Sequence, residues 1–349
     1  MPIILDNDAA DDLIGLIDLI SNPKVNLLGV TIVGTGEVDG LTGAQNVADV
    51  CQFLGKPAMP IAYGNNKPCD INALPFPDDV RQSVNHFLQG KGIPKNQTPN
   101  ITDSAVLLIK KLLIQSQRKV TIIATGPLTN VAEFIIQYPT LKEKIEKIVI
   151  MGGAIDVKGN VQALHPNSKE EHVELNFAAD PAAVDLVFKS QVPILLVPLD
   201  LTNQVPITKE FYQALARQKQ PGLILIHQLY ADLLKSCRDE NEFFENFCLW
   251  DPLAVRVAIE PQLVVTEKVA LSVDAQTGRI DREKLQSKTG SIDAAMHLHH
   301  KEKFLMSYLE TLKKQLMDHQ VKISQRTVIQ NQQFIDPPQA SLESSLQFK

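Results

Sequence analysis

The alternation of short apolar runs with amphipathic segments constrains the fold of this chain more than any other feature. Strand-like runs occur at Ile3–Leu5, Leu27–Val33, Met59–Ala62, Val120–Ala124, Lys147–Met151 and Pro193–Val197. Segments with helical spacing of apolar residues lie between them, at Leu13–Ile20, Leu41–Leu54, Ser104–Gln115, Leu128–Tyr138 and Pro181–Phe188. Strand–helix–strand order builds parallel pairs whose crossover helices cover the sheet. The sequence therefore predicts an α/β protein with a Rossmann-like, mostly parallel central sheet and helices on both faces.

No linker divides the first part of the chain, so the pattern predicts a single domain over residues 1–320. A helix over Lys301–Met317 is expected to close it, and residues 321–349 are expected to form a polar C-terminal tail. Residues 64–103, 160–172 and 237–248 are expected to be irregular, the first with a short helix. Long loops in compact domains are often active-site lids, so these three segments are candidates for the walls of a site.

Composition excludes several classes of function. The net charge of −6 argues against a nucleic-acid or anionic membrane partner. No apolar run approaches the roughly 18 residues that span a membrane, and the N-terminal sequence has no signal-peptide pattern. The four cysteines show no CxxC spacing, which argues against a zinc site or a redox pair. A cytoplasmic enzyme with reduced thiols is the expectation.

Four aspartates follow the first apolar run within seven residues: Asp6, Asp8, Asp11 and Asp12. Lys24 is the first cation along the chain. Two like charges about 4 Å apart repel by roughly 4 kcal/mol at an effective dielectric constant near 20. A hard divalent cation such as Ca²⁺ or Mg²⁺ relieves this repulsion, and open α/β sheets bind ligands at this edge. The alternative is a solvated, acidic helix N-terminus.

Four further segments carry polar residues at predicted strand ends or helix starts. The first of these segments is a turn after Ala124. Either Thr129 or Asn130 is expected to cap the helix that follows this turn, and the turn exposes backbone carbonyls as possible Ca²⁺ ligands. Each segment taken alone has a structural explanation as a helix cap, a surface residue or core filler. The segments are Thr125-Gly126-Pro127-Leu128-Thr129-Asn130, Met151-Gly152-Gly153 leading to Gly159-Asn160, Glu174-Leu175-Asn176 with Asp180-Pro181, and Trp250-Asp251-Pro252.

Together and in this order, these motifs resemble the inosine-uridine preferring nucleoside hydrolase family over residues 2–315. More narrowly, Ile150–Val161 and Leu249–Asp251 resemble its purine-specific, inosine-adenosine-guanosine branch. The resemblance implies the nucleoside hydrolase fold and Ca²⁺-dependent hydrolysis of the N-glycosidic bond of ribonucleosides, with a preference for purines. Because family members are dimers or tetramers, it also implies a homodimer or homotetramer.

The resemblance also implies roles for individual residues. Asp8 would be the general base, and Asp6 would orient the aspartate loop. Trp250 occupies the position before the last metal ligand, where many members have a histidine, and would stack on the purine. The metal ligands would be Asp8, Asp12, the carbonyl of Thr125, and Asp251; the ribose would be bound by Asp11, Thr35, Asn160, Glu174 and Asn176.

The chain departs from the family pattern in three places. The aspartate loop is one residue short, so either Asp11 and Asp12 keep their roles or the helix start rotates by about 100°. Thr35 is the nearest match to a ribose-binding Asn or Asp. Val80 stands where the purine branch has a second stacking aromatic, and the aromatics that could replace it are Phe76, Phe243, Phe244 and Phe247.

Three other functions remain open from the sequence. A haloacid-dehalogenase-like phosphatase would use Asp6 as nucleophile and Asp8 as acid with Mg²⁺, but Ala10 departs from its motif. A catalytically impaired Ca²⁺- or nucleoside-binding protein on the same scaffold is a second alternative. A hydrolase of another N-riboside, such as nicotinamide riboside, is the third.

Overall fold

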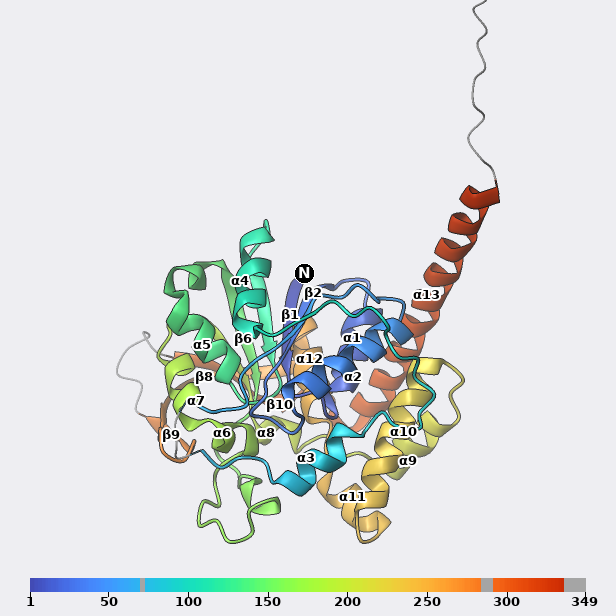
Figure 1. The fold of residues 1–349 in the computed structure, drawn as a ribbon. Helices are drawn as coiled ribbons and strands as arrows, with labels where there is room; N and C mark the ends of the chain where they lie inside the picture. Colours follow the sequence, from blue (N-terminus) through green and yellow to red (C-terminus); the bar gives the residue numbers. More distant parts are fainter. Residues whose placement is uncertain (70–72, 284–290, 336–349) are drawn as a thin grey trace, which may run out of the picture.

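The computed structural model describes residues 1–69, 73–283 and 291–335. Within them, ten strands form one sheet in the order β4-β3-β2-β1-β5-β6-β7-β10-β8-β9 (Figure 1). The strands are β1 (Pro2–Asn7), β2 (Asn26–Ile32), β3 (Ile61–Tyr63), β4 (Ile101–Thr102), β5 (Val120–Ala124), β6 (Ile145–Met151), β7 (Ile194–Val197), β8 (Val264–Val273), β9 (Ile280–Glu283) and β10 (Ser291–Leu298).

In the sheet order from β4 to β10, all neighbouring strands pair in parallel. Strand β8 then pairs antiparallel with β10 on one side and with β9, at the edge of the sheet, on the other. The mostly parallel α/β architecture predicted from the sequence is therefore confirmed. All six predicted strands are present. The pattern missed β4, which has two residues, and the last three strands in the chain, β8 to β10. In β8 only Val264 and Val269 are buried, so a buried apolar run is missing from its sequence.

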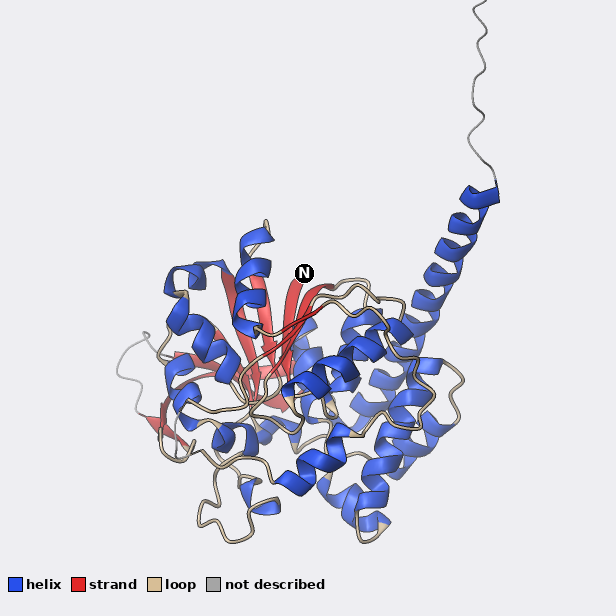
Figure 2. Ribbon diagram, viewed as in Figure 1, coloured by secondary structure: helices blue, strands red, loops and turns tan. Residues whose placement is uncertain are grey.

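Two apolar cores lie on opposite faces of the sheet, each covered by helices (Figure 2). The first core packs under α1 (Asp12–Ser21), α2 (Gly40–Phe53), α10 (Pro221–Ser236), α12 (Trp250–Ile259) and α13 (Lys301–Ile335). The second packs under α4 (Ala105–Gln115), α5 (Thr129–Gln137) and α7 (Pro181–Phe188). Short polar residues start some of these helices: Ser104 caps α4 through the Leu107 N–H, and Asp180 caps α7 through the Ala183 N–H.

The remaining helices are short. They are α3 (Asp78–Asn85), α6 (Leu175–Ala179), α8 (Leu199–Thr202), α9 (Lys209–Ala216) and α11 (Glu240–Asn246), with 3₁₀ turns at Pro139–Lys144, Val161–Ala163 and Pro261–Leu263. Helix α3 is the short helix expected within residues 64–103. Residues 237–248 were expected to be irregular but contain α11, because Asp239 caps the N–H groups of Asn241 and Glu242.

Two further expectations for helices need correction. Helix α13 continues to Ile335, past the expected end at Met317 and into the segment expected to be a polar tail. Thr129 and Asn130 do not cap α5, which has no side-chain cap. Among the described residues, no helix combines the length and the apolar character needed to cross a membrane.

Helices α1 and α12 pack closely side by side. A Cβ on Gly15 of α1 would lie 2.9 Å from Val255 Cγ2 of α12, so glycine permits this approach. Nearby, Arg256 Nη1 lies 3.3 Å from Asp18 Oδ1, and both side chains are buried. Arg256 Nη2 also lies 2.9 Å from Glu260 Oε1. This packing sets the N-terminal ends of the two helices beside each other at the carboxyl edge of the sheet.

Candidate active site

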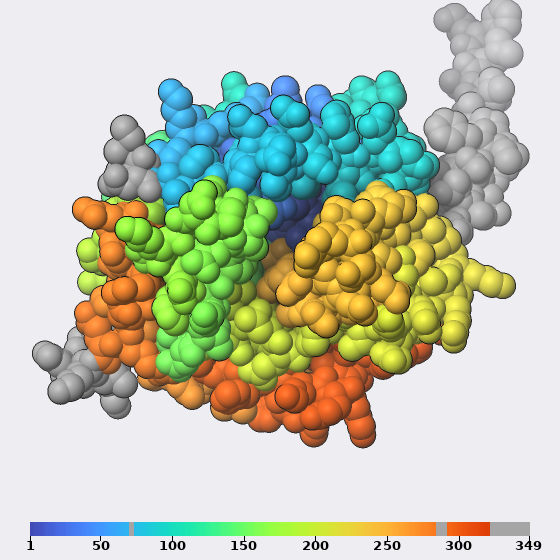
Figure 3. Space-filling view, turned by 90° about the horizontal axis from the view of Figure 1, so that it is seen from below, coloured from blue at the N-terminus to red at the C-terminus, as the bar shows by residue number. Residues whose placement is uncertain are grey.

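A cavity of about 1010 Å³ opens at the carboxyl ends of β1, β5 and β6. In Figure 3 it is a hollow with N-terminal residues, in dark blue, at its floor. Its walls come from α3, from residues 158–164 and from the end of α10 through α11. The three segments that the sequence marked as candidate walls all contribute to its lining.

The aspartate loop is a tight turn between β1 and α1. Ala9 has a left-handed backbone (φ 60°), and the Asn7 side chain accepts a hydrogen bond of 3.1 Å from its N–H. The turn is packed from outside by the segment after β2. A Cβ on Gly36 would lie 2.2 Å from Asp8 Cβ, and the N–H of Glu37 donates to Asp8 Oδ2 at 3.1 Å. The position of Asp8 therefore depends on a glycine at position 36.

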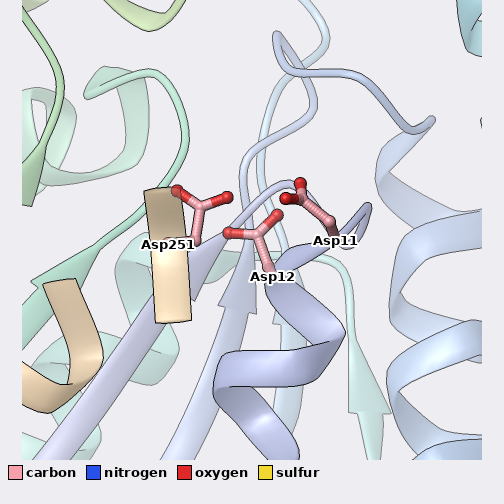
Figure 4. Close-up of side chains that lie close together, drawn as sticks. All are labelled: Asp11, Asp12 and Asp251. Carbon is pink, nitrogen blue, oxygen red and sulfur yellow. The ribbon is translucent and has the colours of Figure 1, made fainter. Parts of the chain in front are cut away.

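Three carboxylates converge above this turn. Asp11, Asp12 and Asp251 each offer an oxygen, and these oxygens all lie within 4.8 Å of one another (Figure 4). Asp11 and Asp12 stand at the start of α1 and Asp251 in the first turn of α12. Burial, reinforced by the charge of Asp8, raises the pKa of Asp11 to about 6 and that of Asp12 well above its usual value. Such a cluster is costly without a counter-charge.

The donor atoms fit a hard cation. Asp251 Oδ1 is buried and has no hydrogen-bond partner within the described chain. Burying an unpaired oxygen costs free energy unless a bound ligand contacts it. Burial and the charges of Asp11 and Asp8 raise the pKa of Asp251 well above normal. Carboxylate and carbonyl oxygens are the ligands preferred by Ca²⁺ and Mg²⁺. The residues present therefore suit a divalent cation.

The predicted metal ligands come together from three elements. Asp12 and Asp251 are in the cluster, and the third member is Asp11, which was assigned to the ribose. Asp8 lines the cavity beside them. Thr125 follows β5, its hydroxyl donates to Asp12, and its carbonyl accepts a bond of 3.2 Å from Asn176 Nδ2. The exact ligand set stays a prediction.

Glu174, Asn160 and Asn176 all line the cavity, and each also fixes local structure. Glu174 accepts hydrogen bonds from three backbone N–H groups, those of Gly153, Asn176 and Phe177. Burial raises its pKa to about 7, against the effect of those bonds. Asn160 Oδ1 accepts from the N–H of Leu175 at 2.9 Å. The same side chains therefore fix the local backbone and also face the cavity, where they could bind substrate.

Aromatic side chains line the cavity from two sides. Trp250 begins α12, and its ring centroid lies 5.7 Å from that of Phe247, with the planes tilted by 56°. Phe76 and Phe87 line the cavity from the segments flanking α3, and Val80 lines it from α3 itself. Of the three aromatics expected near residues 237–248, Phe247 reaches the cavity. Phe243 is fully buried in the core instead.

Of the predicted site residues, Asp12 and Thr35 do not line the cavity; Asp12 belongs to the carboxylate cluster, whereas Thr35 lies apart from both. Thr35 is buried, and its hydroxyl lies 2.8 Å from the Thr129 hydroxyl, which also donates to Asp180 Oδ2 at 2.6 Å. Glu37, two residues further on, lines the cavity. Sequence reasoning missed Glu37; the only signal was its position in the Gly34–Glu37 turn after β2.

Asp6 points away from the cavity. Its Oδ1 accepts hydrogen bonds from Thr31 Oγ1 at 2.6 Å and from Asn130 Nδ2 at 2.7 Å. Burial raises its pKa to about 7, against these bonds. Asp6 therefore ties the end of β1 to β2 and α5. This placement is consistent with the expected role of orienting the aspartate loop.

The fold and the site define an α/β enzyme with an acidic, aromatic-walled cavity at the carboxyl edge of its sheet. The chain belongs to the inosine-uridine preferring nucleoside hydrolase family, whose model matches residues 3–306. It is therefore a nucleoside hydrolase, an N-ribohydrolase of the glycosidase class. This confirms the family and the reaction expected from the motifs.

Individual relatives differ in the substrates that their names state. The chain is 30% identical over 277 residues to the pyrimidine-specific ribonucleoside hydrolase RihA of Citrobacter koseri, covering 79% of this chain and 85% of that protein. A solved inosine-uridine preferring nucleoside hydrolase from Bacillus anthracis is 25% identical, with a TM-score of 0.76 and coverage of 90% and 100%. A purine-preferring ribonucleoside hydrolase from Gardnerella vaginalis, 24% identical, shares the fold with a TM-score of 0.72, covering 91% and 99%.

Proposed function

We propose that the chain is a Ca²⁺-dependent ribonucleoside hydrolase with a preference for purines. The observation that carries the metal dependence is the cluster of Asp11, Asp12 and Asp251, with oxygens within 4.8 Å and one of them buried without a partner. Asp8, Asp12, Asp251 and the Thr125 carbonyl would hold the cation, and Asp11 lies close enough to share it. A bound Ca²⁺ supplies Lewis acidity that acidifies a water and orients the ribose diol.

The chain's own carboxylates then account for the hydrolysis. Asp8 accepts the proton of the attacking water over hydrogen-bond distance. Cleavage of the N-glycosidic bond develops positive charge on the ribose, and carboxylates already fixed around the sugar stabilise that charge. Asn160, Glu174 and Asn176 face the same cavity and would hold the ribose hydroxyls. Their backbone hydrogen bonds fix their rotamers before substrate binds.

The preference for purines rests on the aromatic wall. Trp250 cannot act as a general acid, because an indole has no proton to donate at neutral pH. Its ring can stack on a departing base and favour the electron-poor, protonated purine. Phe247, 5.7 Å from Trp250 between ring centroids, extends this wall. A purine offers a larger stacking area than a pyrimidine, so the wall favours purines.

We also propose a homodimer or homotetramer, on the resemblance to the family alone. Light scattering on the purified chain tests it, and a monomer at micromolar concentration would exclude it.

The test of function is a reducing-sugar assay on inosine, adenosine, guanosine, uridine and cytidine, with and without EDTA. We expect ribose release that EDTA abolishes and that is faster for the three purines. Faster release from uridine and cytidine would refute the purine preference alone. If calorimetry shows Ca²⁺ binding but none of these five nucleosides releases ribose, the chain is either the non-catalytic binding protein or the hydrolase of another N-riboside considered above. The Asp8→Asn variant is the control for background hydrolysis.

A further inference from the structure

The cavity carries far more negative than positive charge. Four carboxylates line it at the carboxyl ends of the strands or beside them: Asp8, Asp11, Glu174 and Asp251. Three more carboxylates line its walls, and they come from the loop after β2, from α3 and from α11. Lys158 is the one cationic side chain among the described lining residues. Seven carboxylates against one ammonium leave a formal surplus of six negative charges, which a divalent cation would reduce to four.

The wall carboxylates are Glu37, Asp79 and Glu245. Lys158 does not offset them, because it is 76% exposed and pairs with Glu171 at 3.1 Å. The cavity thus has a negative potential that exceeds what a metal site at its floor requires. A ligand that brings positive charge would relieve it.

Among the described residues that line the cavity there is no histidine, tyrosine or arginine. Cys248 lines it, but burial raises the pKa of its thiol to about 12, so it is a poor acid at neutral pH. A neutral base must gain a proton to leave easily, whereas a base with a quaternary nitrogen needs none. The aromatic wall of Trp250 and Phe247 also favours a cationic ring.

Building on the nucleoside hydrolase function, we propose that the preferred substrates are N-ribosides whose base carries a fixed positive charge: N7-alkylated purine or pyridinium ribosides. Cleavage breaks the C1′–N bond, and its electron pair neutralises the base nitrogen. Water forms the new C1′–O bond and gives its proton to Asp8, which releases it to solvent. The products are ribose, a neutral base and one proton. Glu37 and Glu245 determine this specificity by attracting the cationic ring.

The test compares inosine, 7-methylinosine, nicotinamide riboside and p-nitrophenyl riboside, at low and high salt. The first two differ by one methyl group, which places a positive charge on the purine ring. The last is neutral with an activated leaving group, so it separates charge from reactivity. We expect KM for 7-methylinosine at least about tenfold below that for inosine, with kcat/KM falling as salt rises for the cationic substrates alone. Nicotinamide riboside distinguishes a pyridinium preference from a purine one.

The variants Glu37→Gln and Glu245→Gln are expected to raise KM for the cationic substrates more than for p-nitrophenyl riboside. Glu310→Gln, an exposed position on α13, changes net charge equally and is the matched control, with all four KM values unchanged. Equal KM values for inosine and 7-methylinosine, with no salt dependence, would overturn this inference and leave the nucleoside hydrolase intact. Ribose release from none of the four substrates would overturn the proposed function itself.

Discussion

Replacing Arg256 with methionine removes the cation that neutralises Asp18 between α1 and α12. The two side chains are 4% and 0% exposed, and their charged atoms lie 3.3 Å apart. Glu260 keeps a partner in the variant, because Lys24 lies 3.6 Å from it. The cost of the substitution therefore falls on Asp18, which is left buried with its charge uncompensated. Because α1 carries Asp12 and α12 carries Asp251, the perturbation lies on the two helices that carry the carboxylate cluster.

Removal of one partner of a buried ion pair typically costs about 3–5 kcal/mol. That is a large share of the roughly 5–15 kcal/mol by which domains are stable. The double variant Asp18→Leu/Arg256→Met replaces both charges with apolar side chains of similar size. Such replacements are often neutral or stabilising, so we expect the double variant within about 1 kcal/mol of the wild type.

The loss of unfolding free energy in the Arg256→Met variant depends on pH. Burial raises the pKa of Asp18 to about 6, although the charge of Arg256 opposes the shift. A carboxyl whose folded-state pKa is raised above the unfolded value of 3.8 costs stability as pH rises from that value to the folded pKa. Without Arg256 the folded pKa rises further, so the cost continues to grow above pH 6. The deficit relative to the wild type should widen from about pH 6 to pH 8 and shrink in acid.

Urea unfolding of the wild type, the single variant and the double variant at pH 5.5, 7 and 8.5 measures these differences. Two results would refute the reasoning. One is a single variant within about 1 kcal/mol of the wild type at pH 7, the range of an exposed pair. The other is a double variant as unstable as the single one, which would mean that lost packing, and not the stranded charge, sets the cost.

Three further predictions concern the site. Gly36→Ala should lower kcat by about 100-fold, because its Cβ would lie 2.2 Å from Asp8 Cβ and displace the proposed base; wild-type turnover in a folded variant would contradict this. Asp251→Asn should abolish high-affinity Ca²⁺ binding in calorimetry, and an unchanged affinity would remove Asp251 from the ligand set. Trp250→Ala should lower kcat for purines more than it raises KM, because stacking acts on the departing base, whereas a change in KM alone would assign Trp250 to ground-state binding.

Local patterns in the sequence were sufficient for the inner sheet and for some helix starts. A buried parallel strand is a continuous apolar run, as in Val120–Ala124, and it is recognisable without knowledge of its neighbours. Ser104 and Asp180 cap their helices within three residues. Strand β8 was missed because only two of its residues are buried, and its pairing with β10 depends on residues far away in the chain.

The same distinction between local pattern and tertiary packing applies to the residues of the site. The sequence alone determined the aspartates of the first loop, the glutamate and asparagine around position 175, and Trp250 with Asp251, since these lie at strand ends or helix starts. Only the tertiary structure decided which side chains meet. Asp251 joins Asp12 because α1 and α12 pack at Gly15 and at the Asp18–Arg256 pair.

Tertiary packing also decided the outcome at Thr35 and Glu37. Both follow β2 in one short turn, and no local periodicity separates them. Thr35 is buried because its hydroxyl meets Thr129 from α5, so Glu37 lines the cavity instead. Hydrophobic periodicity determines which face of an element is buried. Contacts between elements distant in sequence depend on how those faces pack, and this packing decided which carboxylates share the cavity.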